Sequence, residues 1–467
     1  MKRLLLFVGL MLATLQAGAE LPPDVSGALK KAGIPTQNVA IYIRPVNAEA
    51  PLLEHNATQS MNPASVMKLV TTNAALELLG PTYRWKTEVY SNGTLENELL
   101  NGDLIIKGYG DPAFKAQDLW RMLQRLRQLG IKNIHGDLII DKDYFDKEVD
   151  AQAVFDGEIW RAYNAMPSTF LVNARNTSFR FSIVDGQVKI DQEFELPEIK
   201  IINNMKVAGR GCAAWRSTMT YQVNVLDDSA TVTFNGTFSP SCGERYIELS
   251  LFNDTQYAYF SFKKLWQELG GSFEGQIKVA ETPDSAVKLI EQFSDPLGYV
   301  VRDVNKWSNN LMARQLLLTI AAEQVGAPAR VDKGEQAIQS WLRTKNLRFN
   351  ELVVDNGSGL SRNTRISAEH LGQMLVSAYN GPTMPEFMAS LAILSKDGTV
   401  MGRLKEGPSN GRAHLKTGSL NGVSAIAGYV LDANGHRHVL VMLVNHAKAS
   451  SSKSAQDALI DWVSLQP

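Results

Sequence analysis

Three short motifs in the sequence combine residue types that can carry out nucleophilic catalysis. The first, Ser65-Val66-Met67-Lys68, places a hydroxyl and an amine three residues apart. On a helix these two side chains share one face, so the amine can lie within hydrogen-bond reach of the hydroxyl. A serine is a poor nucleophile until a base removes its proton, and a lysine can be that base only if its pKa is lowered. The motif therefore predicts Ser65 as nucleophile and Lys68 as base.

The second motif, Ser308-Asn309-Asn310, offers a hydroxyl and an amide two residues apart. We expect the Ser308 hydroxyl to relay a proton between the lysines and the leaving amine. The Asn310 side chain can hold an amide group of the substrate.

The third motif, Lys416-Thr417-Gly418, adjoins an expected strand. Lys416 can be the second cation that lowers the pKa of the base, and Lys416 and Thr417 can bind a substrate carboxylate. Gly418 lets the substrate backbone approach closely. An oxyanion needs two N–H donors, and we assign those of Ser65 and Ser419.

Each motif alone also has an ordinary structural explanation. The first pair could lie on a helix surface, Ser308 could cap a helix over residues 309–320, and Lys416 with Thr417 could form a solvated strand edge. The joint order of the three motifs, each on the expected element, favours catalysis.

The elements that must position these motifs lie towards the two ends of the chain. Residues 63–79 are expected to form a helix, because Pro63 suits a first helical turn and Gly80 with Pro81 ends the apolar periodicity. Further helices are expected near residues 295–322, 367–379 and 454–465. Strands are expected at residues 39–44, 51–54, 413–415, 424–431 and 438–444, with a hairpin turn at 433–435. This pattern predicts an α+β core assembled from both chain ends.

The middle of the chain, from residue 83 to about 285, has a different pattern of expected secondary structure. Alternating β-rich runs dominate it, separated by Gly and Asn turns, and one short amphipathic helix is expected over residues 119–129. It is interpreted as a mostly β segment set within the core.

The charge balance and the first residues give information about the partners and the cellular location of the protein. The chain has 467 residues with 47 Lys and Arg against 48 Asp and Glu, so no electrostatic argument favours nucleic acid. Residues 1–19 resemble a cleaved secretory signal: a basic start, an apolar run and a final Ala-Gly-Ala. An uncleaved membrane anchor is the alternative.

The only two cysteines, Cys212 and Cys242, are expected to form a disulfide in an exported protein. Two free buried thiols are the alternative. No metal site or cofactor is expected, because no His lies between the cysteines and no metal or nucleotide motif occurs.

Together these motifs resemble the low-molecular-mass class C penicillin-binding proteins, the D-alanyl-D-alanine carboxypeptidase/endopeptidase family. More than half of the chain separates Ser65 from Ser308, and that family carries inserted domains there. Residues 108–112 (Gly-Tyr-Gly-Asp-Pro) and 355–362 (Asp-Asn-Gly-Ser-Gly-Leu-Ser-Arg) also resemble it. Asn356 departs slightly from the family's Asp-Gly-Ser-Gly-Leu.

The resemblance implies a transpeptidase/β-lactamase-like core, an antiparallel sheet with flanking helices, with inserted mostly β domains. The boundaries it suggests are a signal at 1–19, a catalytic domain at 20–82 and 285–467, an inserted domain at 83–172 and 265–284, and a nested β-rich domain at 173–264.

The resemblance further implies a periplasmic enzyme in which Ser65 is acylated by peptidoglycan stem peptides or by inhibiting β-lactams. It would cleave D-Ala-D-Ala ends and D-Ala-diaminopimelate cross-links. Arg362 would hold the diaminopimelate carboxylate, and Asp141 would meet its ammonium, unless these are simply a surface arginine and a turn residue. A peripheral association with the inner membrane stays open, and the oligomeric state is not readable.

Two rival functions remain at this point. A β-lactamase uses the same acylation chemistry, although the long gap between the first two motifs argues against a compact lactamase. A non-catalytic periplasmic binding or scaffold protein could keep the fold, although its intact motif residues argue against that.

Overall fold

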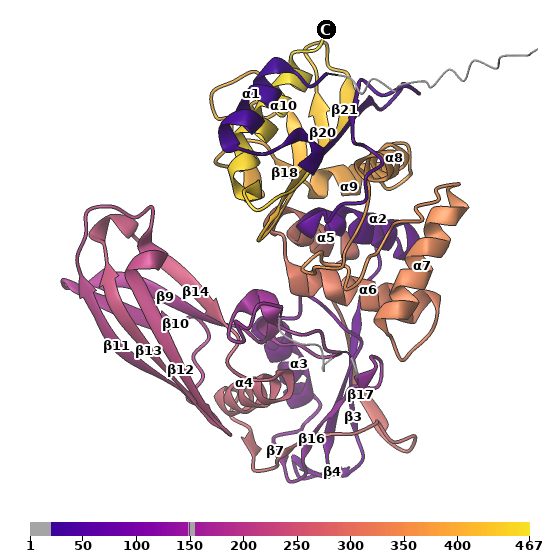
Figure 1. Ribbon diagram of the computed structural model, residues 1–467. Coiled ribbons are helices and arrows are strands. Elements are labelled where there is room, and N and C mark those ends of the chain that lie inside the picture. The colour runs from indigo at the N-terminus through magenta and orange to yellow at the C-terminus, as the bar shows by residue number, and fades with distance from the viewer. Residues whose placement is uncertain (1–19, 148, 150–154) are drawn as a thin grey trace, which may run out of the picture.

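A six-stranded antiparallel sheet joins the two ends of the chain (Figure 1). The computed structural model describes residues 20–147, 149 and 155–467, so the expected signal peptide lies outside it. The strand order is β18-β19-β20-β21-β1-β2. The bounds are β1 (Val39–Pro45), β2 (Leu53–His55), β18 (Ala392–Ile393), β19 (Ala413–Leu420), β20 (Val423–Leu431) and β21 (Arg437–Asn445). This confirms the expected α+β core, including the hairpin turn between β20 and β21.

Helices cover both faces of this sheet because successive residues of a strand point to opposite sides. Ile41 and Ile43 pack with α1 (Pro23–Ala32) and α10 (Lys453–Ser464). Ala40 and Tyr42 pack in a second core with the remaining helices. These are α2 (Lys68–Leu79), α5 (Leu297–Trp307), α6 (Asn310–Gln324), α7 (Val331–Thr344), α8 (Ala368–Tyr379) and α9 (Met384–Ser390).

Two further sheets follow α2 in the chain and pack with two helices. The five-stranded sheet has the order β16-β8-β6-β3-β17, and the four-stranded sheet has the order β15-β7-β5-β4. The bounds are β3 (Lys86–Ser91), β4 (Thr94–Glu96), β5 (Leu99–Asn101), β6 (Leu104–Gly108), β7 (Asn133–Ile134), β8 (Leu138–Asp141), β15 (Ser272–Phe273), β16 (Ile277–Val279), β17 (Val287–Phe293), α3 (Ala116–Gln128) and α4 (Asp254–Glu268).

The structure differs here from the boundaries suggested by the sequence. Helix α4 runs without a break across the suggested boundary at residue 264. Strand β17, the last strand of the five-stranded sheet, pairs with β3 up to Phe293. This sheet therefore extends beyond residue 285, where the sequence placed the return to the catalytic domain.

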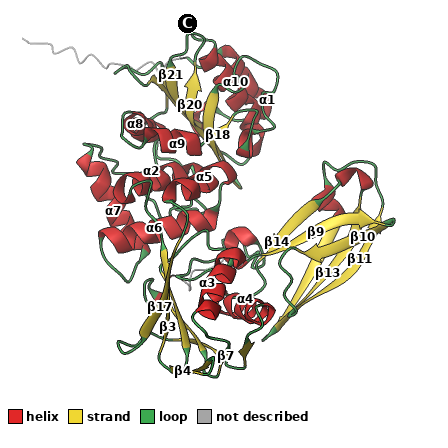
Figure 2. Cartoon of the chain, turned by 180° about the vertical axis from the view of Figure 1, so that it is seen from behind, coloured by secondary structure: helices red, strands yellow, loops and turns green. Residues whose placement is uncertain are grey.

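Two three-stranded sheets form a β sandwich at one side of the molecule (Figure 2). One has the order β10-β9-β14 and the other the order β11-β13-β12. Phe179 and Phe181 of the first sheet contact Phe234 of the second edge to face. The bounds are β9 (Thr177–Val184), β10 (Gln187–Gln192), β11 (Ile199–Val207), β12 (Met219–Leu226), β13 (Ser229–Phe238) and β14 (Arg245–Leu249).

The sandwich also contains the expected disulfide. Cys212 and Cys242 are bonded, with their Cα atoms 5.0 Å apart. The bond ties the long connection after β11 to the turn before β14, which confirms the pairing.

Two expected helices differ in detail, and both differences fall at the motifs. The helix expected from residue 63 starts as a 3₁₀ turn over Ala64–Met67 and becomes α-helical only at Lys68. The helix expected over residues 295–322 is broken at Ser308, which has a φ of 61°. Ser308 therefore does not cap α6; the Asn309 side chain does so by accepting from the Met312 N–H.

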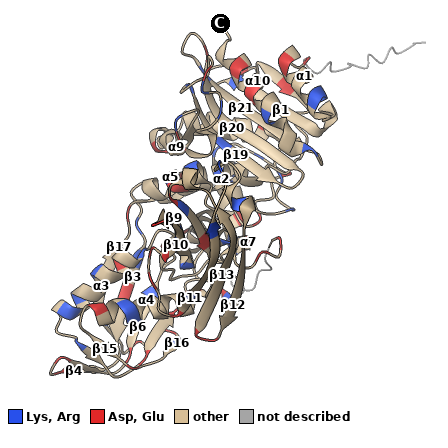
Figure 3. Cartoon of the chain, turned by 90° about the vertical axis from the view of Figure 1, so that its left-hand side faces the viewer, with Lys and Arg blue, Asp and Glu red and all other residues tan. Residues whose placement is uncertain are grey.

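Charges of both signs lie along α1, α3 and α10 (Figure 3), in keeping with the near-neutral balance of the sequence. Within residues 20–147, 149 and 155–467, no helix has the length and apolar character needed to cross a membrane.

Candidate active site

The turn that carries Ser65 is held in an unusual backbone conformation. Ala64 has a φ of 47°, which costs energy for a residue other than glycine. The Asn62 side chain stabilises it, because its Oδ1 accepts the Ala64 N–H at 2.8 Å. In the 3₁₀ turn that follows, residues i and i+3 eclipse, so Lys68 lies directly along the axis from Ser65.

Lys68 is the centre of the site. It is fully buried, and its Nζ lies 2.9 Å from Ser65 Oγ. Nζ also donates to Asn310 Oδ1 at 2.6 Å and to the Ser358 carbonyl at 2.5 Å. Burial, followed by the charges of Lys416 and Arg314, holds the pKa of Lys68 well below its usual value. A lowered pKa favours the neutral amine, which is the form that can accept the Ser65 proton.

Lys416 contacts Ser308, which lies in the break between α5 and α6. Its Nζ donates to Ser308 Oγ at 2.8 Å and to the Thr417 carbonyl at 2.7 Å. Burial lowers the pKa of Lys416 to about 7. The break between α5 and α6 thus presents Ser308 to one lysine and Asn310 to the other, and the structure brings all five expected catalytic residues together.

Strand β19 passes very close to the nucleophile. A Cβ on Gly418 would lie 2.5 Å from the Pro63 carbonyl oxygen and 3.0 Å from the Ser65 nitrogen, so only glycine fits. The exposed Ser419 follows on the same strand. The Thr417 hydroxyl lies 2.8 Å from the Thr399 hydroxyl.

Arg362 lies beside the end of this strand. Its Nη1 donates to the carbonyl of Asn421, just after β19, at 2.7 Å. Its guanidinium lies over the Phe155 ring, 5.0 Å from the centroid. The side chain is exposed, so its remaining donors are accessible.

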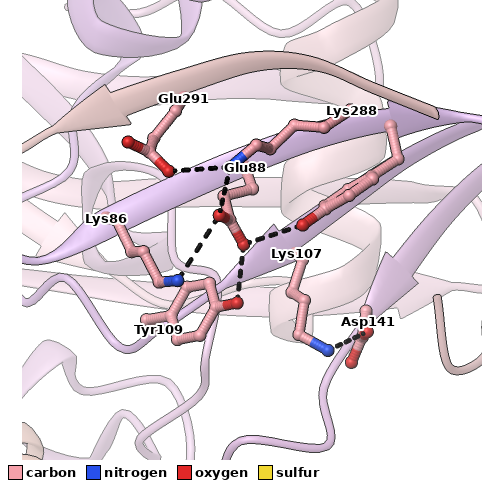
Figure 4. A network of polar contacts seen from close by, with 8 residues as sticks. Lys86, Glu88, Lys107, Tyr109, Asp141, Lys288 and Glu291 are labelled. Atoms are coloured by element: carbon pink, nitrogen blue, oxygen red, sulfur yellow. Dashed lines mark hydrogen bonds and ion pairs between the residues drawn. The ribbon is translucent and has the colours of Figure 1, made fainter. Parts of the chain in front are cut away.

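Asp141 is not part of this cluster. It ends β8, its side chain is fully buried, and Lys107 donates to its carboxylate at 2.8 Å (Figure 4). The Thr282 hydroxyl donates to the same oxygen at 2.7 Å. Burial raises the pKa of Asp141, but these donors outweigh that effect and hold the pKa below its usual range. In this structure the Asp141 carboxylate is satisfied inside the protein, and its contact with a substrate ammonium stays a prediction.

Three contributors to the site were given no role by the sequence. The Ser358 carbonyl belongs to the 355–362 stretch, where a Cβ on Gly359 would lie 1.9 Å from the Ala64 oxygen. Arg314 is 6% exposed and follows Asn310 by one helical turn on α6. Asn62 also donates to the Ser361 carbonyl at 2.9 Å. The helical spacing from Asn310 was the one available signal for Arg314.

Comparison with known proteins identifies the family of the chain. The model of the D-Ala-D-Ala carboxypeptidase 3 (S13) family matches residues 21–466. The chain belongs to this S13 family.

Relatives of this S13 chain include two proteins with the corresponding names. The D-alanyl-D-alanine carboxypeptidase DacB of Haemophilus influenzae is 26% identical over 416 residues, 87% of this chain and 85% of the relative. The D-alanyl-D-alanine carboxypeptidase of Actinomadura sp. is 25% identical over 457 residues, 94% of this chain and 84% of the relative.

The fold is similar to that of a solved structure. The crystal structure of penicillin binding protein 4 (dacB) from Haemophilus influenzae matches with a TM-score of 0.78 at 24% identity, covering 95% of this chain and 99% of that one. The same Haemophilus protein has also been solved in complex with a β-lactam, and that structure matches with a TM-score of 0.74.

Proposed function

We propose that this S13 chain is a periplasmic serine D,D-peptidase with Ser65 as its nucleophile. It removes the terminal D-Ala of peptidoglycan stem peptides and cleaves D-Ala-diaminopimelate cross-links. One observation carries the assignment: a fully buried Lys68 amine lies 2.9 Å from the Ser65 hydroxyl. A buried amine whose pKa is lowered can act as a base towards that hydroxyl.

Acylation begins with proton transfer from Ser65 Oγ to Lys68 Nζ. The oxygen attacks the carbonyl carbon of the penultimate D-Ala, and the negative charge develops on the carbonyl oxygen. The N–H groups of Ser65 and Ser419 receive this charge, which the approach of β19 to the Ser65 nitrogen supports. The Asn310 amide, fixed by its contact with Lys68, orients the substrate.

The leaving amine then needs a proton. The Ser308 hydroxyl, in contact with Lys416, lies in the turn that also presents Asn310 to Lys68, so it can pass a proton between these groups. The C–N bond breaks, and the ester on Ser65 remains. Water attacks this ester with the same base, and the shortened peptide leaves. A β-lactam would acylate Ser65 by the first half of this sequence, and the complex of the Haemophilus relative supports this.

The charge of Lys416 gives a pH dependence that can be measured. Because burial lowers the pKa of Lys416 to about 7, it is cationic below that pH and neutral above it. Its attraction for a C-terminal carboxylate is therefore lost as the pH rises through about 7. We expect kcat/KM for a D-Ala-D-Ala acid, divided by that for the corresponding C-terminal amide, to fall over this range. The ratio cancels the titration of Lys68, which affects both peptides. A constant ratio would move the carboxylate site elsewhere.

Arg362 is proposed to bind the diaminopimelate carboxylate through its free donors. Arg362→Ala should raise KM by about tenfold for peptides carrying diaminopimelate, because a charge-assisted hydrogen bond is lost. A minimal D-Ala-D-Ala peptide should be much less affected. Arg343→Ala, an exposed arginine on α7, is the matched control and should change neither constant. Equal effects of Arg362→Ala on both peptides would rule out this role.

Digestion of purified muropeptides with mass analysis of the products tests the proposed function. We expect loss of one alanine from pentapeptide stems and conversion of cross-linked dimers to monomers. Rapid turnover of nitrocefin with unchanged muropeptides would indicate a β-lactamase instead. Neither product, together with no labelling by a fluorescent penicillin, would indicate a binding protein.

A further inference from the structure

A large cavity lies between the catalytic core and the β sandwich, and the mechanism above uses only one end of it. Its volume is about 1310 Å³. One wall is formed by residues 307–311, which include Ser308 and Asn310. The opposite wall comes from the sandwich strands β12 and β14. The cavity is therefore continuous with the site of bond cleavage.

The sandwich wall consists of two sheet edges. β12 is the last strand of its sheet and β14 the last of the other. The end of β14 is partly covered, because Arg161 pairs with Leu249 and the Ser250 N–H donates to the Trp160 carbonyl. Within the part of the chain that the structure describes, no segment other than β13 pairs with the backbone of β12. A free strand edge can accept an extended peptide by main-chain hydrogen bonds.

The side chains around this edge suit a peptide with charges of both signs. Arg161 and Arg216 supply positive charge, and Glu158 and Glu248 supply negative charge. Arg161 is already fixed over the Tyr221 ring of β12, 5.6 Å from the centroid. Trp307, next to Ser308, is 61% exposed and offers an apolar face.

We propose that this cavity binds the second stem peptide of a cross-linked substrate, as an extended strand added to the free edge of β12. The proposal rests on the proposed function, because only a cross-linked substrate carries a second peptide beyond the cleaved bond. Stem peptides carry free carboxylates and an ammonium group, which match the arginines and glutamates of the walls. Specificity for cross-links over single stems would then be located in the inserted sandwich, outside the catalytic residues.

Two variants remove groups from the cavity without touching the catalytic cluster. Tyr221→Ala removes an aromatic wall, and Arg216→Ala removes an exposed cation, so the second remains usable if the first fails to fold. Asn224→Ala is the matched control, because Asn224 is exposed on the same strand but does not line the cavity. The measurements are kcat/KM for a purified cross-linked muropeptide dimer and for a short D-Ala-D-Ala peptide, and the rate of penicillin acylation.

We expect Tyr221→Ala and Arg216→Ala each to lower kcat/KM for the dimer by about tenfold or more, with short-peptide hydrolysis and penicillin acylation unchanged. Hydrogen exchange of Ser65→Ala should slow in Met219–Leu226 on addition of the dimer and not of the short peptide. Equal losses on both substrates, or no loss with unchanged exchange, would overturn the cavity proposal alone. A wild-type enzyme that hydrolyses the short peptide but leaves the dimer intact would overturn both this proposal and the endopeptidase part of the proposed function.

Discussion

Ser65→Ala is expected to lower kcat for a D-Ala-D-Ala peptide by more than about 10⁴-fold, because no other hydroxyl can take over its position. Ser308 Oγ is held by Lys416, and Lys68 Nζ is directed at Ser65, Asn310 and the Ser358 carbonyl. The variant should fold normally, since Ser65 is only half-buried and loses a single oxygen. Release of D-alanine from the peptide is the measurement.

Ser60→Ala is the matched control for this experiment. Ser60 is an exposed serine five residues earlier in the chain, and its loss should leave the rate unchanged. If Ser65→Ala retained a rate near that of the wild type, the acyl-enzyme mechanism would be wrong.

Lys68→Met is expected to slow penicillin acylation by about 10²–10⁴-fold, the usual contribution of a general base. Methionine keeps the length of the buried side chain but removes the amine. The substitution leaves Asn310 Oδ1 and the Ser358 carbonyl without their donor, so we expect the free energy of unfolding to fall by about 1–3 kcal/mol while the protein still folds. Stopped-flow acylation and thermal unfolding measure the two effects separately.

The exposed Lys30 on α1 provides the matched substitution, and Lys30→Met should leave acylation unchanged. Near-normal acylation by Lys68→Met would assign the base to another group. A loss of stability well beyond about 3 kcal/mol would contradict the expectation that Lys68 contributes to the fold only through these two hydrogen bonds.

The catalytic cluster was predictable from the sequence because motif spacing carries geometry. A serine and a lysine three residues apart must share a helical face, and both a 3₁₀ turn and an α-helix satisfy that condition. The order of the three motifs then indicated which elements had to meet. The structure shows Ser65 in contact with Lys68 and Ser308 in contact with Lys416.

Other parts of the site depend on contacts that no local pattern encodes. The Ser358 carbonyl accepts from Lys68 only because a glycine-rich loop packs against the Ala64 turn. The pairing of Asp141 with Lys107 is one of these contacts, because an acidic residue after a strand looks the same in the sequence whether it faces a substrate or an internal lysine.

The inserted sheets also depend on contacts between distant residues that no local pattern encodes. Strand β17 joins β3 across about 200 positions of the sequence, from Val287↔Ser91 to Phe293↔Lys86. Local alternation predicted that strands occur in this region but gave no information about which strands pair. The cavity wall formed by β12 and β14 depends on these pairings, so it became visible only in the structure.

Peptide mapping of the penicillin-treated enzyme by mass spectrometry tests the central claim most directly. The account predicts one penicilloyl group per chain, on the fragment that contains Ser65, formed more slowly by Lys68→Met. A label on a fragment without Ser65, or no covalent label at all on the folded wild-type protein, would contradict it.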